Sequence, residues 1–137
     1  TLKSRIASDK LSLLFCSKLI HLLSIESRDE SNTVEKAMAL FSSEMDRGIN
    51  ITDISERIGL SLAHLRRLFH KITGSSPSKV FEEIRMKRAR ELCRFTDYSF
   101  GEIAGACGFA EQSSFSKAYI RYWNKTPSDE RKSEKII

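Results

Sequence analysis

Basic, amide and hydroxyl side chains recur at helical spacing in two short stretches of this 137-residue chain. Setting aside the apolar positions of the first stretch leaves Ala63, His64, Arg66, Arg67, His70 and Lys71. The same step in the second stretch leaves Gln112, Ser113, Ser116, Lys117, Ile120 and Arg121. Arginine can donate two hydrogen bonds to guanine and glutamine can pair with adenine, while lysine, serine and histidine suit phosphate oxygens. These residue types therefore indicate contacts with nucleic acid.

Both stretches belong to an internal repeat with an offset of 49 to 50 residues. In each copy a short apolar-faced segment ends at a glycine, Gly59 or Gly108, and a longer segment with a polar face follows. Such a glycine permits the left-handed backbone of a tight turn. The pattern is typical of a helix-turn-helix, in which the first helix braces the second and the second can enter a major groove.

The apolar spacing predicts helices and no strands, so the fold class is all-α. We expect helices over residues 11–25, 34–45, 52–58, 61–73, 77–95, 100–106 and 111–123. Residues 26–33 have the composition of a linker, and Pro127 is expected to precede a charged tail. Expected N-caps are Thr52 or Asp53, then Ser61 and Ser76. The architecture is two helix-turn-helix units joined by a long central helix and preceded by an extra N-terminal helix.

The stretch from about residue 34 to 131 resembles the DNA-binding domain of AraC/XylS-type bacterial transcription regulators. The resemblance is carried by the segments GSSPSKVFEEIRMKRAREL, IAGACGFAEQSSFSKAY and TPSDER. The family pattern is matched by Gly74, Pro77, Phe81, Arg85, Arg88, Ala89, Leu92, Ile103, Ala104, Gly108, Phe109, Phe115, Tyr119, Pro127 and Arg131. Two departures are Asn124 in place of a glycine and Glu130 in place of an aromatic residue. Asparagine tolerates the left-handed conformation, whereas Glu130 predicts looser C-terminal packing.

The resemblance implies seven helices and the use of both recognition helices on double-stranded DNA. By alignment to the family pattern, the base-contacting residues are Ala63, Arg66, Arg67, Gln112, Ser113 and Lys117. Phosphate contacts are expected from Ser61, His70, Lys71, Ser116 and Arg121. Ala63 is small where a large side chain is often found, so it can read a thymine methyl group or nothing.

Residues 34–131 are expected to form the domain, with a first unit at about 51–73, a linking helix at 77–95 and a second unit at about 100–123. Residues 1–28 form an apolar helix and linker. They belong to the end of an upstream domain, to a dimer interface, or to a helix that packs on this same domain.

Composition limits the other function classes. Lys and Arg number 23 against 18 Asp and Glu, a net charge of +5 that favours an acidic partner. Three cysteines cannot form a disulfide framework, and we interpret them as core residues of a protein in the reducing cytoplasm. No catalytic constellation, cofactor site or metal-ligand spacing stands out, and no apolar run reaches membrane-spanning length. Arg85 and Arg88 are expected to pair with Glu83 or another acidic residue.

The sequence therefore predicts a sequence-specific DNA-binding transcription regulator, an activator by family habit, and not an enzyme. The alternative is a protein–protein interaction module that docks an acidic partner through its basic helix faces. RNA polymerase is a second candidate partner, and residues 1–25 are a candidate homodimer element. No cofactor and no membrane association are expected.

Overall fold

The computed structural model describes residues 2–135, with side chains described for residues 16–133. Within that range all regular structure is helical, which confirms the predicted all-α class. The elements are α1 (Leu2–Glu44), the short 3-10 helix η1 (Met45–Arg47), α2 (Ile51–Ile58), α3 (Leu62–Thr73), α4 (Pro77–Phe95), α5 (Phe100–Ala106), α6 (Gln112–Trp123) and α7 (Pro127–Lys135).

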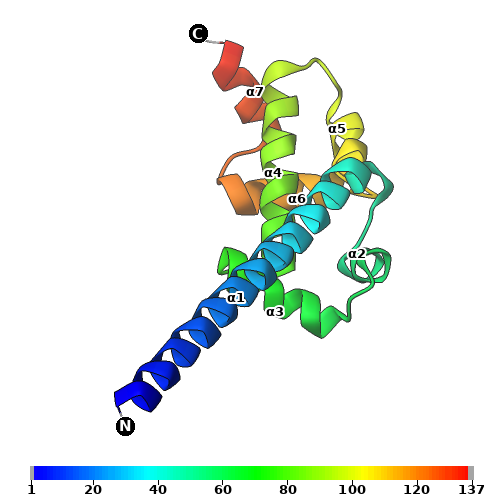
Figure 1. Ribbon diagram of the computed structural model, residues 1–137. Helices are drawn as coiled ribbons and strands as arrows, with labels where there is room; N and C mark the ends of the chain where they lie inside the picture. Colours follow the sequence, from blue (N-terminus) through cyan, green and yellow to red (C-terminus); the bar gives the residue numbers. More distant parts are fainter. Residues whose placement is uncertain (1, 136–137) are drawn as a thin grey trace.

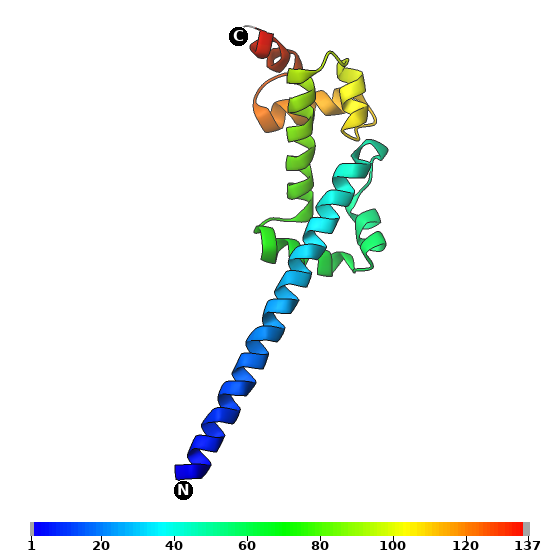
Figure 2. The same cartoon turned by 45° about the horizontal axis from the view of Figure 1, so that its top comes forward.

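Helix α4 is the centre of the domain and contacts α1, α3, α5, α6 and α7. Figure 1 shows α2 and α3 near one end of α4, with α5 and α6 towards the other end. Helix α1 runs across the domain, and its N-terminal half projects away from it (Figure 2). At about 1.5 Å per residue, the 43 residues of α1 span about 65 Å.

The predicted linker at residues 26–33 is wrong, because α1 continues through it without a break. The segment is polar but contains neither glycine nor proline, so nothing in it interrupts the backbone hydrogen bonds. The Thr33 hydroxyl instead donates to the Asp29 carbonyl oxygen, 2.8 Å away and one turn earlier in the helix. Polar composition here reflects an exposed helix face.

The interpretation of residues 1–25 as a helix packed on this domain does not hold for residues 16–25. All of their side chains are exposed, including five large apolar ones: Leu19, Ile20, Leu22, Leu23 and Ile25. Cys16 is exposed too, so only Cys93 and Cys107 are core residues as expected. The side chains of residues 1–15 lie outside the described part of the chain.

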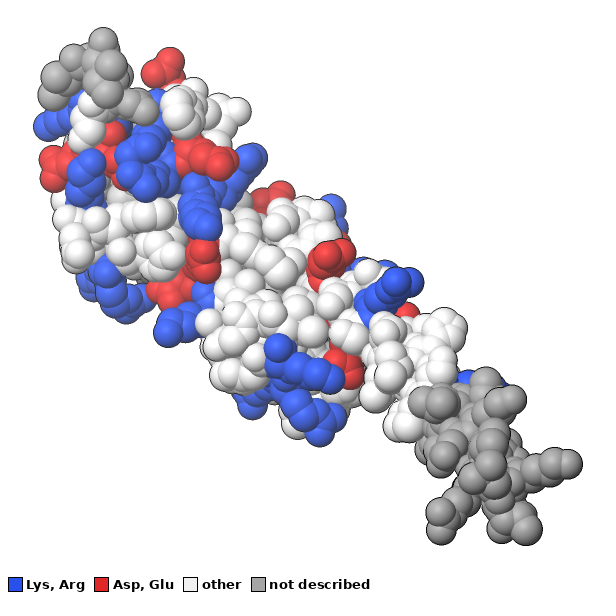
Figure 3. All heavy atoms as spheres, turned by 60° about the vertical axis from the view of Figure 1, so that its left-hand side comes forward, with Lys and Arg blue, Asp and Glu red and all other residues white. Residues whose placement is uncertain are grey.

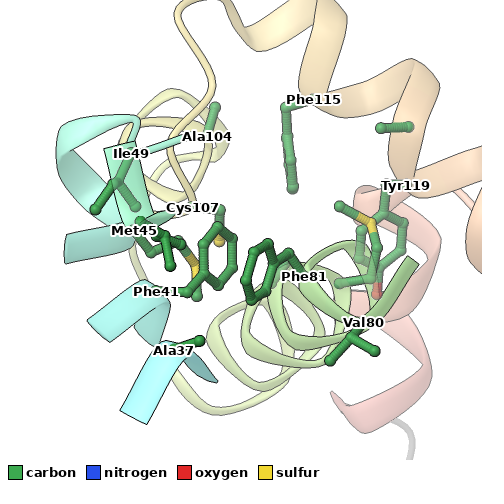
Figure 4. Close-up of a cluster of buried hydrophobic side chains, with 14 of the residues drawn as sticks. Ala37, Phe41, Met45, Ile49, Val80, Phe81, Ala104, Cys107, Phe115 and Tyr119 are labelled. Atoms are coloured by element: carbon green, nitrogen blue, oxygen red, sulfur yellow. The ribbon is translucent and has the colours of Figure 1, made fainter. Parts of the chain in front are cut away.

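Aromatic residues that are distant in sequence meet in the core. The Phe41 and Phe81 rings stack at 4.4 Å between α1 and α4, beside Met45 and Cys107 (Figure 4). The Phe69 ring from α3 meets Phe81 edge-on at 5.5 Å. Figure 4 also places Phe115 and Tyr119 of α6 along the same core. The core therefore joins α1, the first unit and the second unit around α4.

The helix ends follow the sequence closely, with one exception. Asn50 caps α2 and exchanges two hydrogen bonds with Asp53, so the prediction of Thr52 or Asp53 as the cap is wrong. Ser61 and Ser76 cap α3 and α4 as predicted. Asn124 adopts φ +56° in the position of the usual glycine, so the tolerance expected of asparagine is confirmed.

The segment after Pro127 is helix α7, and it packs on α4 and α6 around one buried carboxylate. Glu130 is buried, with about 1% of its side chain exposed. It accepts hydrogen bonds from the Tyr119 hydroxyl at 2.8 Å and from Lys125 Nζ at 3.1 Å, and Arg90 and Arg94 lie 3.0 and 3.3 Å away. The expected charged tail and looser packing are therefore wrong, because three cations and a hydroxyl offset the burial of the charge.

At Gly108 the turn of the second unit lies against the backbone of η1, directly after the end of α1. Gly108 has φ +85°, and a Cβ atom there would overlap the carbonyl oxygen of Met45. The turn glycine of the first unit, Gly59, has φ +80° and no atom within 4 Å of its Cβ position. The two glycines thus share a backbone conformation but differ in the space around them.

This difference predicts unequal costs for two alanine substitutions. Gly59→Ala should lower the free energy of unfolding by about 1–2 kcal/mol, the cost of left-handed backbone. Gly108→Ala should cost at least about 2 kcal/mol more, because the backbone of η1 must also move. Urea unfolding of both variants measures this. Equal losses would show that the second turn is not packed against Met45.

The Glu130 cluster predicts a pH-dependent stability. Burial alone would raise the pKa of Glu130, but the hydrogen bonds from Tyr119 and Lys125 and the charge of Arg94 hold the pKa below its ordinary value. The carboxylate therefore stabilises the fold above the ordinary glutamate pKa, and this stability is lost as the pH falls through the lower folded value. Glu130→Gln should cost about 2–3 kcal/mol at neutral pH, since the partner cations are partly exposed.

Urea unfolding at neutral and acidic pH tests this, and the difference between native chain and variant should shrink in acid. Glu83→Gln, which removes only an exposed pair with Lys87, is the matched control and should stay within measurement error. A Glu130→Gln loss that is the same at both pH values contradicts the assignment.

Candidate nucleic-acid interface

Helix α3 presents the residues predicted for the first recognition surface. Ala63, Arg66 and Arg67 are exposed on it, while Leu65, Leu68 and Phe69 face the core. Among the predicted phosphate contacts, His70 and Lys71 are exposed in the last turn of the helix. The Ser61 hydroxyl oxygen caps the helix by accepting from the His64 backbone N–H at 3.1 Å, and its hydrogen remains available to donate.

Helix α6 presents a less charged surface of the same kind. Gln112, Ser113, Lys117 and Arg121 are exposed, and Ser116 is half-buried. The Ser113 hydroxyl lies 3.4 Å from a carboxylate oxygen of Glu111. The Gln112 side chain folds towards α5, because its Oε1 lies 3.4 Å from the Cβ position of Gly101. The structure thus exposes the predicted residues of both helices except the half-buried Ser116, and their contacts with DNA stay a prediction.

Most of the positive charge in the basic block of residues 60–94 is engaged within the protein. Of nine bases, Lys71, Lys87, Arg88, Arg90 and Arg94 lie within 4 Å of carboxylates, and Arg85 lies between aromatic rings. Within the described part of the chain this leaves Arg66, Arg67 and Lys79 without an ion-pair partner. Two of these three, Arg66 and Arg67, are among the residues predicted to contact bases.

Lys71 forms an ion pair that was not predicted from the sequence. Its Nζ lies 2.6 Å from a carboxylate oxygen of Glu30 in α1. The hydrogen bond and the charge of Glu30 raise the pKa of Lys71 above its ordinary value. Lys71 therefore stays fully charged, but it must leave Glu30 or share it in order to contact a phosphate. No local signal indicated this pair, because the two residues are distant in sequence.

Arg85 was predicted to pair with a carboxylate, and this prediction is wrong. Its guanidinium lies 5.5 Å from the Phe41 ring centre and 5.1 Å from that of Phe109, and burial lowers its pKa. Arg88 is 3.9 Å from Glu91, and Glu83 pairs with Lys87 instead. Arg85 is thus a bridge between α1 and the second turn rather than part of an ion pair.

Three further observations concern the charge distribution, possible metal ligands and possible membrane spans. Figure 3 shows, on one face, Lys and Arg side chains in several groups, with Asp and Glu side chains beside and between them and white areas that carry no charged side chain. Among the described residues, no three His, Cys, Asp or Glu side chains come together as metal ligands would. Within the described residues no helix has the length and apolar character needed to cross a bilayer.

Comparisons with known proteins agree with this geometry. A family model described as a helix-turn-helix domain matches residues 54–133. The chain is 32% identical over 103 residues to the HTH-type transcriptional regulator GbdR of Pseudomonas aeruginosa, covering 75% of this chain and 28% of that protein. The chain spans less than half the length of the curated relatives that it matches.

Solved structures share this all-helical fold. A transcriptional regulator of Chromobacterium violaceum with an AraC-type DNA-binding domain superposes with a TM-score of 0.69 at 33% identity, over 78% of this chain and 96% of that one. The DNA-binding domain of AdpA, solved in complex with a target DNA, has a TM-score of 0.70 at 23% identity over 75% and 93% of the two chains, a likeness of fold. The chain therefore belongs to the AraC/XylS-type family of transcription regulators, and residues 54–133 form its helix-turn-helix domain.

Proposed function

We propose that the chain binds double-stranded DNA sequence-specifically as part of a transcription regulator, with α3 and α6 in successive major-groove segments. The observation that carries this proposal is the pair of exposed helices, each following a short helix and a left-handed glycine, on a domain of this family. That the related GbdR is a transcriptional regulator and that AdpA was solved with DNA support it further.

The spacing of the two helices supports joint reading of one duplex. Helix α4 separates the units by 19 residues, which is about 28 Å at 1.5 Å per residue. This is comparable to the ~34–36 Å between successive major-groove segments on one face of B-DNA. The exposed residues of the two copies differ, so the site should consist of two unlike half-sites in direct arrangement.

Individual roles follow from residue chemistry. Base contacts fall to Ala63, Arg66, Arg67, Gln112, Ser113 and Lys117. Phosphate contacts are assigned to Ser61, His70, Lys71, Ser116 and Arg121.

The second candidate function is docking of an acidic protein through the same basic faces. Sequence preference in DNA binding distinguishes the two functions. A DNA-binding chain prefers its selected duplex to a shuffled competitor and loses affinity steeply with salt.

The remaining parts of the proposal concern the whole protein. We infer a cytoplasmic activator without catalytic activity that acts with RNA polymerase. Residues 34–131 form the DNA-binding domain, and residues 1–28 precede it as an interaction element. Cys16, Ile20 and Leu23 follow the three- and four-residue spacing of a coiled-coil seam. We therefore propose a second copy of the chain as the partner of residues 1–25, in a homodimer that sedimentation can detect.

The predicted base contacts and phosphate contacts should respond differently to substitution. Arg66→Ala or Arg67→Ala should cost roughly 1–3 kcal/mol of binding and relax base preference at one or two positions. Lys71→Ala should weaken all duplexes alike and reduce the salt slope by about one. Glu30→Gln should strengthen all duplexes alike, because it releases Lys71 for phosphate.

Fluorescence anisotropy with selected and shuffled duplexes over a salt series measures these effects, with Lys87→Ala as a control for loss of a distant cation. The roles are overturned where Lys71→Ala changes the preferred sequence and both arginine substitutions leave it intact.

Joint reading by both units predicts a strict dependence on half-site spacing. Inserting ~5 bp between the half-sites turns the second groove segment to the opposite face of the duplex, and a full turn places it out of reach. Both insertions should reduce affinity to that of a single half-site. Unchanged affinity for the spaced sites would show that α3 and α6 do not read one duplex together.

A further inference from the structure

A cleft of about 580 Å³ opens between the two helix-turn-helix units, alongside α4. Its lining includes Phe41 of α1, Arg66 of α3, Phe81 and Arg85 of α4, and Arg121 of α6. Ligand pockets for small molecules commonly occupy about 300–1,000 Å³ and often lie between structural units. The cleft therefore has the size and the location of a small-molecule site, and both recognition helices contribute to it.

The apolar part of the lining is rigid and aromatic. Phe41 and Phe81 stack on each other (Figure 4), and both are buried, as are Met86 and Ile49 of the same lining. Phe109 of the second turn is half-buried and completes this part of the wall. Phe41 and Phe81 already expose almost none of their surface, so a flat or aliphatic ligand body gains mainly by leaving water itself and by covering the half-buried Phe109, without moving the core.

The charged part of the lining has an excess of cations. Three arginines, Arg66, Arg85 and Arg121, line the cleft against one acidic residue, Glu82. Neither Arg66 nor Arg121 forms an ion pair with any residue whose side chain the structure describes. The Arg85 Nε is buried and finds no hydrogen-bond acceptor in the same part of the chain. An anion in the cleft would offset this charge and accept hydrogen bonds from planar donors.

We propose that this cleft binds a small amphipathic anion, a molecule with an aromatic or aliphatic body and a carboxylate or sulfonate group. The body packs against Phe41, Phe81 and Phe109, and the anionic group accepts from the arginines. A bound molecule contacts both units at once. It also occupies Arg66 and Arg121, so it competes with DNA, a consequence that rests on the proposed function.

Anilinonaphthalene sulfonate is a suitable probe, since it joins an aromatic body to one sulfonate and fluoresces in apolar sites. Titration of the native chain without DNA should show saturable binding at one site. Ser78→Phe places a ring at the exposed edge of the cleft and should weaken the binding about tenfold. Arg121→Met should weaken it about fivefold while keeping the apolar stem.

The repeat supplies a matched control. Ser128 follows Pro127 as Ser78 follows Pro77, is exposed, and lies outside the cleft, so Ser128→Phe should bind the probe like the native chain. Leu23→Gln, on the exposed apolar face of α1, should also leave binding unchanged. Native affinity in Ser78→Phe, or loss of binding in Leu23→Gln, overturns the proposal, as does the absence of saturable binding.

Competition is measured separately with the selected duplex. The probe should lower the apparent affinity of the native chain for DNA and have little effect on that of Ser78→Phe. Probe binding in the cleft without any change in DNA affinity overturns the competition. Because the titration without DNA stands alone, failure of the cleft and failure of DNA binding give different results.

Discussion

The backbone of the second turn lies so close to the carbonyl of Met45 that position 108 has no room for a side chain. At the same junction Phe41 stacks on Phe81, and the Arg85 guanidinium lies between the rings of Phe41 and Phe109. Close-packed interiors resist small displacements, because each shift opens a void or creates an overlap. The two helix-turn-helix units therefore cannot rotate independently about α4. The relative position of α3 and α6 depends on this junction as much as on the length of α4.

Local backbone features could be predicted because they depend on neighbours in sequence. The glycines at 59 and 74, the caps at Ser61 and Ser76 and the apolar faces of α3 and α6 all follow from periodicity and turn chemistry. The partners of the charges could not be predicted in this way. Lys71 meets Glu30 across two helices, and Arg94 meets a carboxylate 36 residues away. A basic block therefore overstates the charge that a surface offers, since tertiary pairing decides which cations remain free.

The two wrong boundaries have a common physical cause. Residues 26–33 and the segment after Pro127 are polar, and polar composition indicates exposure rather than loss of helix. In α1 the polar residues lie on an exposed face of a continuous helix. In α7 one of them, Glu130, faces inward and is offset by a hydroxyl and three cations from α4, α6 and the turn between α6 and α7. Only the arrangement of these elements distinguishes a solvated glutamate from a buried one.

The repeat duplicates a backbone geometry without duplicating its chemistry. In the first unit Arg66 and Arg67 remain unpaired within the described residues, and Lys71 is held by an acid of α1. In the second unit Lys125 is held by Glu130, while Arg131 donates to the carbonyl oxygens of Cys93 and Tyr98 and anchors α7 to the end of α4. Its recognition helix keeps Lys117 and Arg121 beside amide and hydroxyl groups. Guanidinium, amide and hydroxyl groups favour different base edges. The packed junction sets where the two helices lie, and the differing side chains set what each of them can contact.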